Sequence, residues 1–270
     1  HEYGSLGCSG DLAPLAHCAL ALMGEGEVID QGVVRSAGEA LADHGLAPVV
    51  LAEKEGLSLI NGTDGMLGML VLALADLEVL ADIADLAAAM SVEGQLGTDR
   101  VFAADLMDLR PHPGQTISAA NLRRFLAGSP IVASHRVGDG VVQDAYSLRC
   151  APQVNGSLRD TLGHATAVAE RELAAAIDNP SVLDGRVESH GNFHGAPLAH
   201  VLDFLAIEVA DVATMSERRT DRFLDVARNR GLPAFLAHDP GVDSGHMIAQ
   251  YTQAGLVAEL KRLATPASVD

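Results

Sequence analysis

Residues 64–93 read DGMLGMLVLALADLEVLADIADLAAAMSVE and contain no proline. Glu78, Asp82 and Asp85 recur at helical spacing within this stretch. Apolar residues that include Leu80 and Ile83 fall on the opposite side of the same helical wheel. The stretch therefore predicts one long amphipathic helix. One interpretation of its acidic stripe is a cation site, but we favour a solvated helix face because charged residues usually occupy that face.

Similar apolar spacing predicts three further long helices, over residues 153–177, 197–222 and 244–263. In the second of these, apolar residues step by four and three: Leu198, Leu202, Leu205, Val209 and Val212. Shorter helices are expected after Asp11 and over residues 35–44, 101–109 and 115–126. Runs of β-branched and aromatic residues, which strands favour, are scarce after residues 48–51. The sequence predicts an all-α fold, a bundle of long helices that forms a single helical unit over residues 1–270.

Composition excludes several classes of partner. The 270 residues carry a formal net charge of −18, and phosphate binding needs clustered Lys and Arg, so a nucleic-acid partner is not expected. The most apolar stretch, residues 66–75, is too short to span a bilayer, and we expect neither a membrane span nor a signal peptide. The three cysteines lack metal-ligand spacing and suit a reducing compartment, which favours a cytoplasmic protein.

Residues 4–17 read GSLGCSGDLAPLAH and contain the three-residue turn Cys8-Ser9-Gly10. In such a turn the Gly10 amide nitrogen can attack the Cys8 carbonyl. Loss of two waters, one of which takes the Ser9 hydroxyl, then leaves a methylidene-imidazolone ring. Glycine suits the attacking position because a Cβ would obstruct the close approach. Taken alone, the segment is equally typical of a Gly-rich loop that leads into a helix, with Asp11 as N-cap and a proline in the first turn.

The whole string resembles, almost position for position, the signature of the histidine and phenylalanine ammonia-lyase family. Five further segments agree with that family in order: LINGT at residues 59–63, VQDAYSLRCAPQV at 142–154, GNFHGAP at 191–197, SERR at 216–219, and GLPAFL at 231–236 followed by DSGHMIAQ at 243–250. The resemblance covers nearly all of the chain. It implies the long-helix fold of aromatic ammonia-lyases and fumarase-like enzymes, with an electrophile loop at residues 4–15.

The resemblance also implies a cofactor and a set of site residues. The cofactor is 4-methylidene-imidazol-5-one, formed from Cys8, Ser9 and Gly10, with no metal. The family more often has alanine at the first of these positions, but cysteine leaves the cyclising backbone unchanged. The other site residues that the resemblance implies are a catalytic Tyr146 and the substrate-binding Asn61, Gln143, Arg149 and Phe193.

Each of these side chains has an ordinary alternative. Arg149 offers the planar fork that a substrate carboxylate needs, yet an arginine is more often part of a structural ion pair. Tyr146 and Phe193 would by themselves more often be core residues. His190 and His194 are four residues apart, as in some metal sites, but no HExxH pattern follows and we discount a metal.

The segment GNFH at residues 191–194 resembles the histidine-selective branch, since phenylalanine-selective relatives tend to have NFQ. The segment HDPGVDSGHMIAQYTQA at residues 238–254 also resembles that branch. We therefore expect elimination of ammonia from L-histidine to give urocanate. The alternative is a phenylalanine or tyrosine ammonia-lyase or aminomutase. A helical assembly in which the loop never cyclises is an alternative of another class.

The resemblance implies a homotetramer whose active sites combine residues from several subunits. Tyr146 and Arg149 are then expected to serve the loop of a neighbouring subunit. The family's tyrosine base, a histidine and a pocket glutamate fall before His1 or after Asp270. The chain is therefore expected to be part of a longer polypeptide and to be inactive alone.

Overall fold

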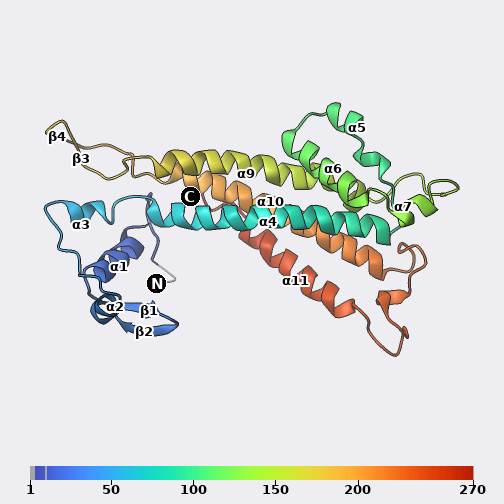
Figure 1. The fold of residues 1–270 in the computed structure, drawn as a ribbon, viewed down its shortest axis with the longest axis horizontal. Helices are drawn as coiled ribbons and strands as arrows, with labels where there is room; N and C mark the ends of the chain where they lie inside the picture. The colour runs from blue at the N-terminus through green and yellow to red at the C-terminus, as the bar shows by residue number, and fades with distance from the viewer. Residues whose placement is uncertain (1–3, 10, 270) are drawn as a thin grey trace. The chain divides into compact units, whose positions relative to one another are not determined.

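The computed structural model describes residues 4–9 and 11–269, most of which are helical (Figure 1). The predicted all-α class is confirmed. The α-helices are α1 (Leu12–Leu22), α2 (Ala37–Asp43), α3 (Glu55–Ser58), α4 (Asp64–Gly94), α5 (Ala104–Asp108), α6 (Pro113–Leu126), α7 (Pro130–Ser134), α8 (Tyr146–Arg149), α9 (Ala151–Leu173), α10 (Ala196–Leu224) and α11 (Met247–Leu263). Short 3-10 helices are η1 (Arg100–Phe102) and η2 (Ala234–Leu236), and the strands are β1 (Glu27–Asp30), β2 (Val33–Ser36), β3 (Ser181–Leu183) and β4 (Arg186–Glu188). Within the described ranges, no helix is both long enough and apolar enough to cross a membrane.

The long helices lie where their apolar spacing places them. α4 and α10 begin and end within two residues of the expected 64–93 and 197–222, and α9 and α11 within about four residues of theirs. α6 begins at Pro113 rather than at residue 115. Proline is favoured at the first position of a helix, because the N–H that it lacks has no partner there.

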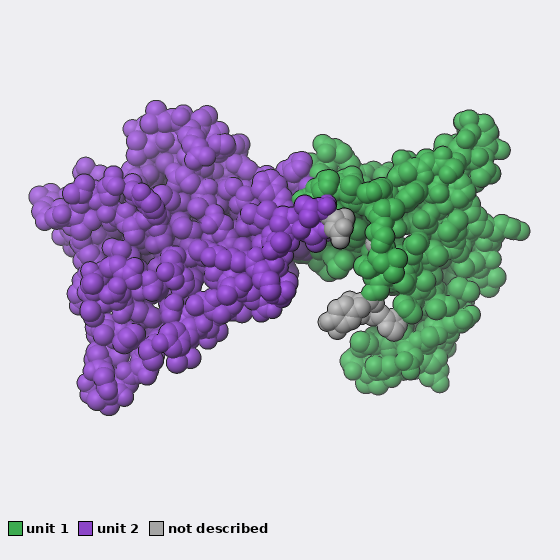
Figure 2. Space-filling model, turned by 180° about the vertical axis from the view of Figure 1, so that it is seen from behind, with its two compact units in different colours: residues 1–72, 167–200 green, residues 73–166, 201–270 purple. Residues whose placement is uncertain are grey.

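The chain divides into two compact units, drawn in green and purple in Figure 2. The first comprises residues 1–72 and 167–200, and the second comprises residues 73–166 and 201–270. Each unit therefore combines segments that are far apart in the sequence. α4, α9 and α10 contribute residues to both. The expected organisation as a single helical unit stays a prediction.

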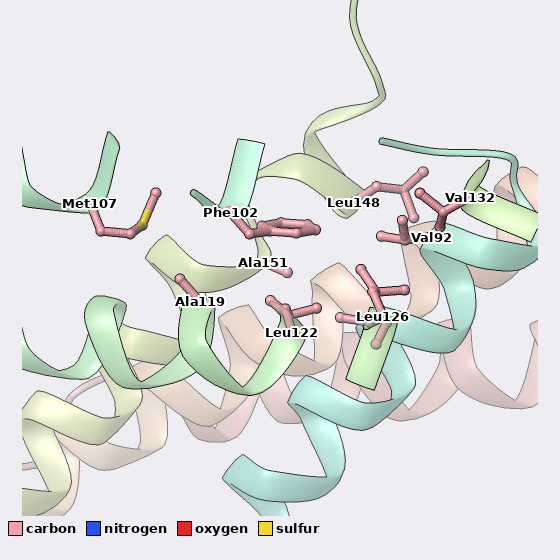
Figure 3. Packing of buried hydrophobic residues seen from close by; sticks show 11 residues of the cluster. Val92, Phe102, Met107, Ala119, Leu122, Leu126, Val132, Leu148 and Ala151 are labelled. Carbon is pink, nitrogen blue, oxygen red and sulfur yellow. The ribbon is translucent and has the colours of Figure 1, made fainter. Parts of the chain in front are cut away.

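The core of the second unit is a cluster of buried apolar side chains that includes Val92, Phe102, Leu122 and Leu148 (Figure 3). Phe102 and Leu122 have no exposed surface, and Leu148 is 2% exposed. Burial of apolar area of this kind is the dominant favourable term in folding. Because Leu148 belongs to the single turn α8, this cluster anchors the segment that carries Tyr146.

The acidic stripe of α4 differs from the expectation at Asp85, which has no exposed surface. Asn121 Nδ2 and Asn155 Nδ2 each donate to this carboxylate at 2.9 Å, and Arg159 Nη2 pairs with it at 2.7 Å. A buried carboxylate is tolerated when its oxygens are paired in this way. Ile83, by contrast, is 54% exposed. The predicted solvated face is therefore wrong for Asp85, because α6 and α9 supply partners on that side of α4.

Short antiparallel hairpins in the first unit were not predicted from the sequence. β1 pairs with β2 through a turn at Gln31 and Gly32, and β3 pairs with β4 through a turn at Asp184 and Gly185. All four turn residues have positive φ, as a type I′ hairpin turn requires. The Asp-Gly pair was a usable signal for the second hairpin.

α6 and α9 meet at two glycines in the second unit. A Cβ added to Gly156 would lie 2.3 Å from the Gln115 nitrogen, and one added to Gly114 would lie 2.1 Å from the Gly156 oxygen. Neither position has room for a side chain. The backbones of α6 and α9 can approach closely here because neither glycine has a side chain.

Candidate active site

The loop that contains Cys8 and Ser9 precedes α1 in the first unit. Ser9 is buried, with 5% of its surface exposed, whereas Cys8 is exposed and forms no disulfide. Gly7 has a φ of +74°, in the left-handed region that favours glycine. Gly10, the third residue of the expected cofactor triad, lies outside the described residues.

Asp11 stands at the N-cap position of α1, but its side chain makes no cap bond there. Its carboxylate instead accepts the backbone N–H of Met66, in the first turn of α4, at 2.8 Å. Burial raises the pKa of Asp11, while hydrogen bonds from Met66 and Ser5 act in the opposite direction. A Cβ on Gly65 would lie 3.1 Å from the Asp11 carboxyl carbon. Asp11 thus occupies the predicted N-cap position of α1, while its side chain joins the loop to the start of α4.

The loop is also joined to the GNFHGAP segment. The backbone N–H of Gly195 donates to the carbonyl oxygen of Cys8 at 2.7 Å. Gly195 is buried, and Phe193, two residues earlier, is half-buried. Gly195 was not identified as a site residue from the sequence, although it lies within a segment that carries the family resemblance.

Asn61 is held by the connection between α9 and β3. Its Nδ2 donates to the Asn179 carbonyl oxygen at 2.8 Å and lies 3.4 Å from Asp178 Oδ1. Asp178 also pairs with Lys54 and accepts a hydrogen bond from Ser58 Oγ at 2.6 Å. Burial favours the protonated form of Asp178, but the hydrogen bonds from Lys54, Ser58 and Asn61 outweigh it and lower its pKa.

The two histidines of the possible metal pair have local hydrogen-bond partners. His190 Nε2 lies 2.7 Å from Ser181 Oγ, and its Nδ1 accepts the Asn192 N–H at 3.1 Å. Because Nδ1 accepts, Nε2 carries the proton, and this ring is not set to deprotonate Ser181. His194 Nδ1 accepts a backbone N–H at 3.2 Å. Among residues 4–9 and 11–269, no group of three or more His, Cys, Asp or Glu side chains could hold a metal ion.

Tyr146 and Arg149 belong to α8 in the second unit. The Arg149 guanidinium carbon lies 4.7 Å from the centre of the Tyr146 ring, within the range of a cation–π contact. Arg149 Nε is buried and has no hydrogen-bond partner among the described residues. A buried donor without a partner is costly, so Arg149 can gain from an added acceptor. Gln143 is exposed in the loop before α8, also in the second unit.

Arg219, the last residue of SERR, is a buried cation in the second unit and is 3% exposed. Its Nη1 donates to the Ser147 carbonyl oxygen of α8 at 3.3 Å. Burial lowers the pKa of Arg219 to about 10. This side chain was not identified as a site residue, because no pattern in the sequence pairs it with α8.

Comparison with known proteins shows which family this chain resembles. The family model for aromatic amino acid lyases matches residues 1–270. A histidine ammonia-lyase of Streptomyces coelicolor is 68% identical over 272 residues, covering 100% of this chain and 53% of that protein. The chain spans about half the length of the curated relatives it matches.

Solved structures are similar over nearly the whole chain. Histidine ammonia-lyase from Trypanosoma cruzi has a TM-score of 0.86 at 40% identity, covering 98% of this chain and 50% of that one. Tyrosine aminomutase from Streptomyces globisporus has a TM-score of 0.89 at 38% identity, covering 98% of this chain and 54% of that one. With the family model matching residues 1–270 as well, the chain belongs to the aromatic amino acid lyase family.

Proposed function

We propose that this chain is part of a carbon-nitrogen lyase that eliminates ammonia from L-histidine to give urocanate. The observation that carries the proposal is the 68% identity, over the full length of the chain, to a histidine ammonia-lyase. A tyrosine or phenylalanine lyase or aminomutase is the second candidate, favoured by the likeness to tyrosine aminomutase at a TM-score of 0.89.

The proposed cofactor is 4-methylidene-imidazol-5-one, formed from Cys8, Ser9 and Gly10 without a metal. The described residues fit such a group. Ser9 is buried, and the Cys8 carbonyl accepts a hydrogen bond from Gly195. The exposed Cys8 side chain is not consumed in ring formation. Such a ring would supply an electrophilic carbon for the amine or the aromatic ring of the substrate.

The remaining site residues are proposed to bind and orient the substrate. Arg149 binds the substrate carboxylate through two parallel hydrogen bonds, and its unpartnered Nε is one available donor. Tyr146, whose ring contacts the Arg149 guanidinium, is the proposed catalytic residue of this segment. Asn61, Gln143 and Phe193 are the other residues proposed to bind the substrate.

We further propose a cytoplasmic homotetramer with shared active sites, in which Tyr146 and Arg149 serve a neighbouring subunit. The three free cysteines support a reducing location. Because the chain spans about half of its relatives, residues 1–270 alone are expected to lack activity.

The test uses the full-length protein and follows urocanate absorbance after L-histidine is added. Competition among histidine, phenylalanine and tyrosine, compared by kcat/KM, decides between the first and second candidates. The mass of the peptide that contains Cys8 to Gly10 tests the remaining alternative, a helical assembly whose loop never cyclises. A deficit of two waters supports an enzyme, whereas an uncyclised loop in well-folded protein supports a non-catalytic helical assembly.

A further inference from the structure

We propose that the backbone N–H of Gly195 is the oxyanion donor for closure of the Cys8-Ser9-Gly10 ring. This inference rests on the proposed function, because it concerns how the proposed cofactor forms. It adds a catalytic group to the maturation step, and that group is a main-chain atom of a segment far from the loop in the sequence.

The hydrogen bond itself is the first argument. Gly195 N lies 2.7 Å from Cys8 O, so its N–H already donates to the oxygen on which negative charge develops during ring closure. Both residues belong to the first unit, and Gly195 is buried. The donor is therefore fixed before any reaction begins.

The position of Gly195 in the chain is the second argument. Its carbonyl oxygen accepts the N–H groups of Leu198 at 3.0 Å and Ala199 at 2.9 Å, so Gly195 is the residue from which α10 starts. α10 runs from Ala196 to Leu224, and the N-terminus of a helix carries partial positive charge. Negative charge on Cys8 O would thus be stabilised by the hydrogen bond and by the adjacent helix end.

The ring-closing step places charge on that same oxygen. The Gly10 nitrogen attacks the Cys8 carbonyl carbon, a C–N bond forms, and the carbonyl electron pair moves onto Cys8 O. This oxygen leaves as water with the protons of the Ser9 and Gly10 amide nitrogens. The Ser9 hydroxyl leaves as a second water with the Ser9 Cα proton. No oxidant, reductant or co-reactant is required. An amide carbonyl is a weak electrophile, so stabilising the negative charge on its oxygen lowers the barrier to attack on the Cys8 carbonyl carbon.

The absence of a side chain at residue 195 is the third argument. A Cβ there would lie 3.2 Å from Cys8 O and 3.0 Å from Met66 Sδ. Both contacts are tighter than ordinary van der Waals separation, so a side chain at residue 195 would require Cys8 O and Met66 Sδ to shift. Glycine allows the N–H to reach Cys8 O directly.

The test replaces the Gly195 amide by an ester in the full-length protein, using glycolic acid on a suppressor tRNA in cell-free translation. The matched control is the leucic acid ester at Leu198, which removes a hydrogen bond at the same end of α10 without touching Cys8. After folding, the mass of the loop peptide is followed over time. Circular dichroism and oligomer size verify that each protein is folded.

We expect the Gly195 ester to lose the two waters about 100-fold more slowly than wild type, the usual effect of removing one oxyanion donor. The Leu198 ester should mature at the wild-type rate. Gly195→Pro removes the same N–H by different chemistry and gives a second test. If either folded Gly195 variant matures at the wild-type rate, the inference is overturned while the proposed function stands. If the wild-type protein itself never loses the two waters, both this inference and the proposed function fail.

Discussion

Arg149 is the residue whose surroundings most directly suggest a ligand, since its buried Nε has no partner among the described residues. In the full-length protein, Arg149→Lys keeps the charge but loses the planar fork that grips a carboxylate. We expect KM for histidine to rise about tenfold or more, because a hydrogen bond to a charged group is worth about 1.5 to 3 kcal/mol. Steady-state kinetics measures this effect.

Stability is the control for this substitution. The thermal midpoint of Arg149→Lys should remain close to that of wild type, because Arg149 Nε has no hydrogen bond to a described residue that the substitution would remove. An unchanged KM together with a lowered midpoint would instead indicate a structural role.

Glu208 is a buried carboxyl whose pH behaviour can be worked out. Burial raises its pKa above the ordinary 4.5, and hydrogen bonds from Ser157 and Thr161 only partly oppose this. Asp211 and Asp160 lie near and raise the pKa further. A raised folded pKa means that the stability contribution is complete below pH 4.5 and is lost as pH rises through the folded value.

Glu208→Gln keeps an acceptor for Ser157 Oγ but cannot ionise. The thermal midpoint of wild type, relative to that of Glu208→Gln, is therefore expected to fall as pH rises above 4.5. Calorimetry of both full-length proteins across this range measures the difference. Parallel midpoints at every pH would contradict the assignment.

At the scale of the element, Asp11 stabilises the start of α4, although it lies next to α1. Asp11→Ala leaves the Met66 N–H without its acceptor, and loss of a helix cap costs about 1 kcal/mol. The chemical denaturation midpoint of the full-length protein should fall accordingly. Asp11→Asn, which retains an acceptor oxygen, should lose less; equal losses would show that the hydrogen bond is not the cause.

The crossing of α6 and α9 provides a second prediction at this scale. Gly156→Ala introduces a Cβ 2.3 Å from the Gln115 nitrogen, so the two helices must separate and the thermal midpoint should fall. Gly163→Ala, on the same helix, meets nothing within 4 Å and should be neutral or stabilising by up to about 1 kcal/mol. Two variants with similar midpoints would contradict this account.

The sequence predicts some elements better than others. Features that depend on neighbouring residues are predicted, and features that depend on distant segments are not. α4 and α10 follow from long stretches of helix-forming residues with regular apolar spacing. The environment of Asp85 could not be predicted in the same way, because its partners Asn121 and Asn155 come from helices distant in the sequence. The hairpin at Asp184 and Gly185 carries a local turn signal, but its strands are only three residues long and leave no clear alternating pattern in the sequence.

At the scale of the whole molecule, the site residues are divided between the two units of the chain. Cys8, Ser9, Asn61 and Phe193 belong to the first, and Gln143, Tyr146 and Arg149 belong to the second. Their identities could be proposed from short segments that resemble a family. The contact between Cys8 and Gly195 could not, because backbone hydrogen bonds across distant segments leave no mark in residue types.

The proposal that Arg149 serves a neighbour's loop can be tested by mixing two inactive full-length variants. Ser9→Ala removes the electrophile and keeps Arg149, whereas Arg149→Met keeps the electrophile and removes the carboxylate fork. If each site combines the two groups from different subunits, random co-assembly gives about a quarter of the sites both intact groups. Histidine turnover should therefore reappear at about a quarter of the wild-type level when the variants are co-expressed.

The control is to mix the two variants after separate assembly, without subunit exchange, where no activity should return. If Ser9 and Arg149 of one site come from the same chain, co-expression cannot restore any site, since every chain lacks one of the two groups. Continued inactivity in verified mixed oligomers would thus reject shared sites. It would leave the lyase assignment intact, because that assignment depends on the two groups meeting and not on which subunit supplies each.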